Sequence, residues 1–145
     1  MPQILELIRD DHGLIRGLFD ELEGDPEARD VRCITLRREL PGHVYAEEAT
    51  LYAYLRDKVP GEIRRSLDEH ARIRETLARF ERIPLRDADW MPALVNLRRE
   101  VEEHFTTEER DVFFLAEQHL DEGILFELGE VFQEEKQRAA ELVVM

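Results

Sequence analysis

The sequence contains a single cysteine, Cys33, and this scarcity excludes several kinds of site. One thiol cannot form a disulfide within the chain, nor supply the cysteine ligands of a zinc or iron–sulfur site. Long apolar runs are lacking as well, and none approaches the ~18 residues that a membrane-spanning helix needs. The opening stretch, MPQILELIRDDH, does not have the layout of a signal peptide. We therefore expect a cytoplasmic protein that does not enter a membrane.

Positive charge is also in short supply. The chain has 34 acidic and 20 basic residues, which gives a net charge of −14. Such a field repels phosphate backbones and anionic membrane surfaces, so we expect no nucleic-acid and no membrane partner. A length of 145 residues with 43% hydrophobic residues is typical of one folded domain, here taken as residues 1–145.

Neither strand alternation nor an Asn-Gly hairpin occurs in the sequence, and apolar residues instead recur at helical spacing. Glycine and proline cluster at a few breaks between Leu-, Glu- and Arg-rich segments. The pattern predicts an all-α fold: an antiparallel up-down-up-down four-helix bundle over about residues 4–118, with an additional C-terminal helix. Pro41 should kink or interrupt the second segment. The expected helices lie near residues 2–23, 26–58, 61–82, 90–118 and 122–142.

Two segments repeat each other without a gap. LRRELPGHVYAEEATLYAYL (36–55) aligns with LRREVEEHFTTEERDVFFLA (97–116), which pairs His43 with His104 and Glu47 with Glu108. A fainter echo pairs Asp11-His12 with Glu69-His70. Two similar helical hairpins indicate an internal two-fold arrangement.

The repeated pattern predicts a metal site. Residues at i and i+4 share a helix face, so each His-x-x-x-Glu pair can point into the bundle beside a histidine of the preceding helix. Imidazole and carboxylate suit iron, manganese or zinc, and a metal removes the cost of burying such groups. If both glutamates bridge, six ligands serve two metals and leave positions open for a small molecule. The candidate ligands are His12, His43, Glu47, His70, His104 and Glu108.

Other polar and aromatic residues receive weaker assignments. Glu48 and Glu109 also repeat, and they are either partners of neighbouring helices or solvated. His119 is expected on the surface, and Cys33 as a small buried or half-buried residue. Among the aromatic residues, which are expected to be core, Tyr45 is the candidate for a hydroxyl near the site.

The order His, His-x-x-x-Glu-Glu, His, His-x-x-x-Glu-Glu resembles the haemerythrin-like family, or HHE cation-binding domains, over about residues 4–118. This resemblance implies a four-helix bundle with a non-haem di-iron centre. The six candidate residues would be its ligands, and Glu47 and Glu108 would bridge the two irons.

The sequence departs from oxygen-carrying haemerythrins at two places. They have a further histidine where this chain has Arg74, and an aspartate where it has Glu108. The more symmetric ligand set looks like bacterial HHE proteins linked to peroxide, nitric oxide or iron. Some relatives that repair iron–sulfur centres carry an extra cysteine-containing N-terminal domain, which is not expected here.

Three functions remain open at this point. The first is a di-iron protein that binds, senses or scavenges oxygen, peroxide or nitric oxide, or handles iron. The second is an enzyme that decomposes peroxide or repairs iron–sulfur centres, and the third is a metal-free interaction module. The C-terminal helix either covers one side of the bundle or forms a homodimer.

Overall fold

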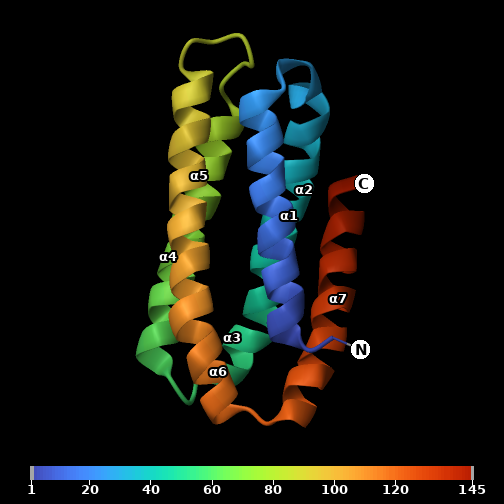
Figure 1. Ribbon diagram of the computed structural model, residues 1–145, viewed down its shortest axis with the longest axis vertical. Coiled ribbons are helices and arrows are strands. Elements are labelled where there is room, and N and C mark those ends of the chain that lie inside the picture. Colours follow the sequence, from blue (N-terminus) through green and yellow to red (C-terminus); the bar gives the residue numbers. More distant parts are fainter. Residues whose placement is uncertain (1, 145) are drawn as a thin grey trace.

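The protein is described by a computed structural model that covers residues 2–144, with side chains for residues 2–142. Within that range the chain is all-helical and contains no strand. Four long helical segments run up and down beside one another, and a fifth lies along one side (Figure 1). The predicted fold class is confirmed. The helical elements are α1 (Ile4–Gly24), a 3-10 turn η1 (Pro26–Ala28), α2 (Arg29–Ala49), α3 (Leu51–Leu55), α4 (Pro60–Glu81), α5 (Trp90–Thr107), a π-helical turn η2 (Glu108–Val112), α6 (Phe113–His119) and α7 (Glu122–Val144).

Local sequence signals fix several helix ends. The Gln3 side chain accepts a hydrogen bond from the Leu5 N–H at the start of α1. The Asp25 side chain likewise accepts from the Glu27 N–H at the start of η1. Pro60 opens α4 at a position where a missing N–H costs nothing. The predicted helix boundaries are therefore close to the observed ones.

Pro41 was predicted to kink or interrupt the second segment. An interruption was the wrong alternative, because α2 continues through this residue. Leu40 and Val44 on either side of it are buried in the core, and this packing outweighs the one backbone hydrogen bond that proline removes. The helical segment breaks instead at Thr50, whose hydroxyl donates to the Ala46 carbonyl over 2.6 Å.

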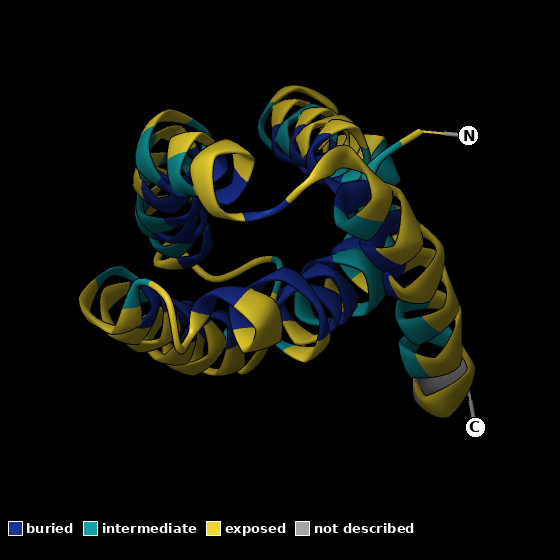
Figure 2. Ribbon diagram, turned by 90° about the horizontal axis from the view of Figure 1, so that it is seen from below, coloured by how far each residue is buried: buried dark blue, intermediate teal, exposed yellow. Residues whose placement is uncertain are grey.

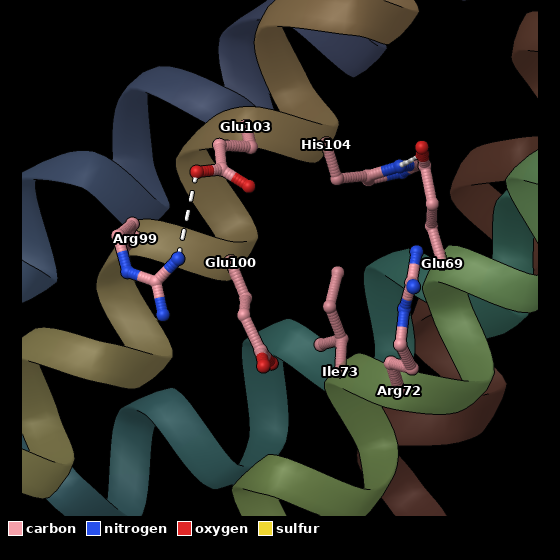
Figure 3. A pocket seen from close by; sticks show the side chains of 7 residues that line it. All are labelled: Glu69, Arg72, Ile73, Arg99, Glu100, Glu103 and His104. Carbon is pink, nitrogen blue, oxygen red and sulfur yellow. Dashed lines mark hydrogen bonds and ion pairs between the residues drawn. The ribbon is translucent and has the colours of Figure 1, made fainter.

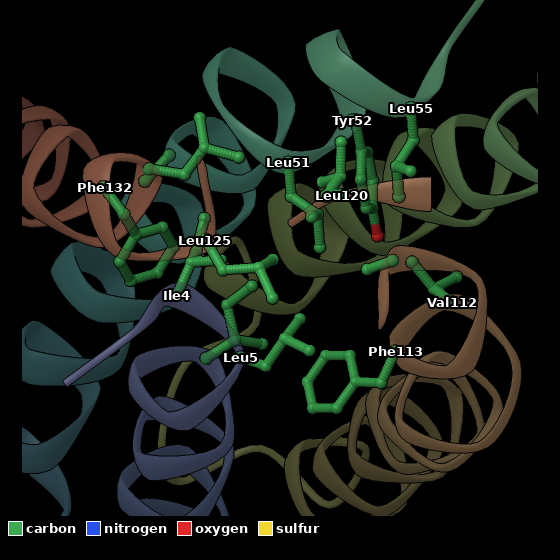
Figure 4. Packing of buried hydrophobic residues seen from close by; sticks show 14 of the residues in the cluster. Ile4, Leu5, Leu51, Tyr52, Leu55, Val112, Phe113, Leu120, Leu125 and Phe132 are labelled. Atoms are coloured by element: carbon green, nitrogen blue, oxygen red, sulfur yellow. The ribbon is translucent and has the colours of Figure 1, made fainter. Parts of the chain in front are cut away.

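The core consists of two hydrophobic clusters, one toward each end of the bundle. One gathers residues of α3, α6, α7 and the start of α1 (Figure 4), and the other includes Phe19, Phe80 and Trp90. Seen along the bundle, buried residues line the sides of the helices that face one another (Figure 2). Between the two clusters the buried residues are histidines and glutamates.

Helix α7 packs against α1 and α2 of its own chain. Phe132 is buried in the first cluster with Ile4 and Leu51. This arrangement is the one expected if the C-terminal helix covers a side of the bundle. Among the described helices, none combines the length and apolarity that a membrane crossing requires.

Candidate metal centre

The six candidate ligands meet in the middle of the bundle. His12 comes from α1, His43 and Glu47 from α2, His70 from α4, His104 from α5 and Glu108 from the π-helical turn. All six are at most 2% exposed. The one-turn spacing of each His-x-x-x-Glu pair brings histidine and glutamate to the same inward face of the helix.

The six residues form two overlapping groups that share both glutamates. In each group every residue offers a ligand atom, and these atoms lie within 4.8 Å of one another. Histidine and glutamate atoms approach closely: His12 Nε2 is 3.0 Å from Glu108 Oε1, and His70 Nε2 is 3.2 Å from Glu47 Oε1. The groups are His12, His43, Glu47 and Glu108, and Glu47, His70, His104 and Glu108.

Each of the four histidines turns its other ring nitrogen, Nδ1, toward a carboxylate of a neighbouring helix. Since a carboxylate only accepts, Nδ1 carries the proton in each case. The Nε2 lone pair is thereby left facing the centre of the bundle, where it can bind a metal. The pairs are His12 with Glu109 (2.6 Å), His43 with Asp11 (2.9 Å), His70 with Glu48 (2.7 Å) and His104 with Glu69 (2.6 Å).

These four pairs form a closed ring around the bundle, which we call the carboxylate ring (Asp11, Glu48, Glu69 and Glu109). Each helical segment gives one carboxylate to the histidine of the next, in the order α1, α2, α4, α5–η2 and back to α1. The ring follows the internal repeat, because Asp11 corresponds to Glu69 and Glu48 to Glu109. Sequence reasoning left Glu48 and Glu109 between two alternatives, and the structure supports interhelical partnership. It missed Asp11 and Glu69, although both precede a candidate-ligand histidine in the repeat.

The pKa values of Asp11 and Glu48, two members of the carboxylate ring, agree with their role as acceptors. Burial opposes ionisation of Asp11, but the hydrogen bond from His43 and the nearby positive charges lower its pKa overall. The pKa of Glu48 is lowered in the same way, against its burial, by His70 and Arg74. Both side chains therefore stay ionised at neutral pH.

Of the two inner carboxylates, Glu47 is in the opposite situation, whereas the pKa of Glu108 is lowered by His104 and His12 in spite of its burial. Burial, and next the charge of Glu108, raise the pKa of Glu47 well above its ordinary value. Both oxygens of Glu47 lack a hydrogen-bond partner among the described residues, as do Nε2 of His12 and of His43. So many orphaned polar atoms inside a protein carry a high desolvation cost, which a bound cation removes. The donor set therefore fits a metal ion.

The comparison with known proteins agrees with this geometry. Residues 3–116 match the family model described as "Hemerythrin HHE cation binding domain". The chain belongs to the haemerythrin HHE cation-binding domain family. No curated protein sequence matches it.

A similar fold occurs in a crystal structure of a hemerythrin HHE cation binding domain-containing protein from Mycobacterium kansasii. The TM-score is 0.88 at 22% sequence identity, and the alignment covers 98% of this chain and 90% of that one. The likeness confirms the fold. Inside this haemerythrin HHE domain, the two buried groups of histidine and glutamate are suited to cations, as the family's description implies.

One hydroxyl reaches the centre of this HHE domain, but it is not the predicted one. Tyr45 is 42% exposed on the outer side of α2, so its assignment was wrong. Tyr52 on α3 is 1% exposed instead, its hydroxyl donates to Glu108 Oε2, and it lies 3.4 Å from His70 Nε2. Burial, and then the charges of Glu108 and Glu47, raise the pKa of Tyr52, so the phenol stays protonated and remains a donor. Tyr52 follows the break at Thr50, which separates α3 from α2 and was not predicted from the sequence.

Aromatic rings enclose the centre on the side of His12 and His43. Phe105 stacks on His12 with ring centroids 3.7 Å apart, and Phe132 of α7 and His43 meet nearly perpendicularly with ring centroids 6.0 Å apart. These rings exclude water from the ligand atoms, as expected for core aromatic residues. His119 is exposed at the end of α6, and Cys33 is half-buried, also as expected.

Arg74 occupies the position at which the resemblance to oxygen-carrying haemerythrins would place a further histidine. Its guanidinium lies outside the bundle, 2.8 Å from Glu48 Oε2. Arg74 therefore supports the carboxylate ring and does not reach the centre.

A cavity of about 240 Å³ opens between α4 and α5 and reaches His104 (Figure 3). Glu69, Glu100 and Glu103 line it together with Arg72 and Arg99. His104 is 2% exposed, whereas the three other candidate-ligand histidines are completely buried. The cavity, which is large enough for solvent molecules, therefore borders one candidate ligand, His104.

Proposed function

We propose that this protein holds a non-haem di-iron centre and uses it to bind, sense or scavenge a small molecule such as oxygen, peroxide or nitric oxide, or to handle iron. The observation that carries the proposal is the sharing of Glu47 and Glu108 by two buried groups of ligand atoms. Such sharing suits two adjacent metal ions, because each carboxylate has two oxygens and can offer one to each metal. The ligands would be His12, His43, Glu47, His70, His104 and Glu108.

The ligand count favours a reactive or sensing centre over a structural one. Two histidines and two shared glutamates give each metal four protein ligands, which leaves coordination positions for exogenous molecules. Bound iron would supply redox chemistry and an affinity for oxygen, peroxide or nitric oxide. The choice of iron rests on the family, since zinc and manganese also accept histidine and glutamate.

The protein's own residues make the centre selective for small molecules. The ligands are buried, and the carboxylate ring keeps the Nδ1 protons in place. The cavity beside His104 is small, and we infer that it gives access to a molecule of a few atoms. We further propose that the chain acts as a single domain in the cytoplasm.

The test is metal content, measured by elemental analysis of protein purified without added metal, with the visible spectrum recorded beside it. We expect near two irons per chain and an oxo-to-iron absorption band that changes on exposure to oxygen, peroxide or nitric oxide. Glu108→Ala should bring the metal content below two per chain, because it removes a shared ligand. His119→Ala, on the exposed end of α6, is the matched control and should change nothing. Retention of both metals in Glu108→Ala would remove the bridging assignment, and failure to take up ferrous iron anaerobically would end the proposal.

A further inference from the structure

A basic side chain of helix α7, that of Lys136, contacts the carboxylate ring. Lys136 Nζ lies 2.7 Å from Asp11 Oδ1 and 3.3 Å from Glu39 Oε2. The other oxygen of Asp11 accepts the hydrogen bond from His43 Nδ1. Both oxygens of Asp11 are thus held, one by the ligand histidine and one by α7.

The basic partners of the other ring members come from the bundle itself. Arg74 of α4 is 2.8 Å from Glu48, and Arg16 of α1 is 3.4 Å from Glu109. Glu69 makes no ion pair with arginine or lysine among the residues that the structure describes. Lys136 is therefore the basic partner that reaches the ring from outside the four-helix bundle.

A second contact joins α7 to the same histidine. The ring of Phe132, one turn before Lys136, makes a T-shaped contact with the His43 ring at an interplanar angle of 83°. Next to His43, Gly42 also faces α7, since a Cβ placed there would be in ordinary van der Waals contact with the Ala139 Cβ at 3.7 Å. Helix α7 also lies outside residues 3–116, the part that matches the family model.

We propose that Lys136 is a positioning residue that orients His43 through Asp11, and that α7 is thereby coupled to the metal position formed by His12, His43, Glu47 and Glu108. The proposal rests on the metal centre proposed above. A fixed Asp11 carboxylate holds the His43 ring and its Nδ1 proton in the orientation that presents Nε2 to a metal. Because coupling is reciprocal, a metal in this position also stabilises α7 against the bundle.

Three matched variants separate this coupling from general effects on stability. Lys136→Met removes the contact with Asp11. Arg74→Met removes the corresponding contact with Glu48, which serves His70 in the other metal position. Arg138→Met lies on α7 as well, but its charge pairs with Glu135 of the same helix. The readouts are stepwise binding of ferrous iron under anaerobic conditions and amide hydrogen exchange of α7 with and without the metal.

We expect Lys136→Met to weaken one of the two iron-binding steps about 10-fold, the lower end of the range for residues that orient metal ligands. In the wild type, iron should slow amide exchange in α7, and in Lys136→Met this slowing should disappear. Arg74→Met should weaken one binding step but keep the slowing in α7, and Arg138→Met should alter neither. Wild-type behaviour of Lys136→Met, or equal effects of Lys136→Met and Arg138→Met, would overturn the proposal.

The metal-free protein keeps this test separate from the proposed function. If the wild type does not take up two irons, the proposed centre fails, but the contact between Lys136, Asp11 and His43 is still measurable. NMR should then show faster solvent exchange of the His43 Nδ1 proton in Lys136→Met than in Arg138→Met. Equal exchange rates in the two variants would overturn the positioning role.

Discussion

At the scale of single residues, the centre departs from its own internal symmetry at one aromatic pair. Tyr52 and Phe113 occupy corresponding positions of the repeat, and both rings stack beside a histidine of the candidate metal centre. Only Tyr52 carries a hydroxyl, and it donates to Glu108. The two shared glutamates consequently have different surroundings, although they are equivalent in sequence: Glu108 accepts from a tyrosine hydroxyl, and among the described residues Glu47 does not.

Removing this hydroxyl should destabilise the metal-free protein. Tyr52→Phe leaves a fully buried carboxylate, Glu108, without one of its donors, and a hydrogen bond to a charged group contributes about 1.5–3 kcal/mol. We expect the free energy of unfolding in urea to fall by about that amount. Tyr54→Phe is the control, since Tyr54 lies on the same short helix but is 51% exposed. Equal stability of the two variants would show that the hydroxyl does not support Glu108.

At the scale of helices, the sequence predicts the number, order and approximate bounds of the segments well. Helical periodicity and the Gly/Pro breaks are local signals, and the observed ends depend on local caps such as Gln3 and Asp25. The interruptions within segments were not predictable in this way. Helix α2 runs through Pro41 and breaks at Thr50, and α5 passes into a π-helical turn at Glu108. Packing around the buried polar layer decides these features, and π-helical turns are common at functional sites.

The docking of α7 against the N-terminus depends on a glycine. A Cβ at Gly129 would lie 3.0 Å from the Pro2 carbonyl oxygen and 3.2 Å from the Ile4 nitrogen, which are backbone atoms that cannot turn away. We expect Gly129→Ala to lower the free energy of unfolding by about 1–3 kcal/mol through overpacking, in spite of alanine's better helix propensity.

Gly13→Ala is the matched control for that substitution. Gly13 also lies within a helix, but a Cβ there meets nothing within 4 Å. It should therefore raise the free energy of unfolding by about 0.5–1 kcal/mol. Urea unfolding of both variants gives the comparison, and a change of the same sign in both would contradict the close approach of α7.

At the scale of the whole molecule, a polar layer divides the core into two hydrophobic clusters. The sequence predicted the six inner residues of this layer, because two aligned His-x-x-x-Glu pairs and two upstream histidines form a regular pattern. It did not predict the interhelical pairs of Asp11 and Glu69, nor the contact of Lys136. These depend on which helices become neighbours and on how far long side chains reach between them. Spacing along a single helix carries no such information.

Within the polar layer, the buried carboxyl of Glu47 should make the metal-free protein less stable than a variant that lacks this carboxyl. Glu47 is fully buried, both of its oxygens lack hydrogen-bond partners in the part of the chain that the structure describes, and its pKa is raised by burial and by Glu108. Glu47→Gln replaces this ionisable carboxyl with a neutral amide, so we expect the metal-free variant to exceed the wild type by about 1–3 kcal/mol in free energy of unfolding at neutral pH. With iron present the order should reverse, because the ligand stabilises the wild type by mass action and the variant has lost a shared carboxylate.

The pH dependence of stability tests the cause of this difference. Because the folded pKa of Glu47 lies above its ordinary value of 4.5, the folded state keeps a proton that the unfolded state releases. The contribution of Glu47 to stability is therefore complete below pH 4.5 and is lost as the pH rises through the folded pKa. Metal-free Glu47→Gln should lack this loss, whereas Glu117→Gln, at an exposed position on α6, should keep it. If wild type and Glu47→Gln lose stability in parallel as the pH rises, the cost of the polar layer does not come from Glu47.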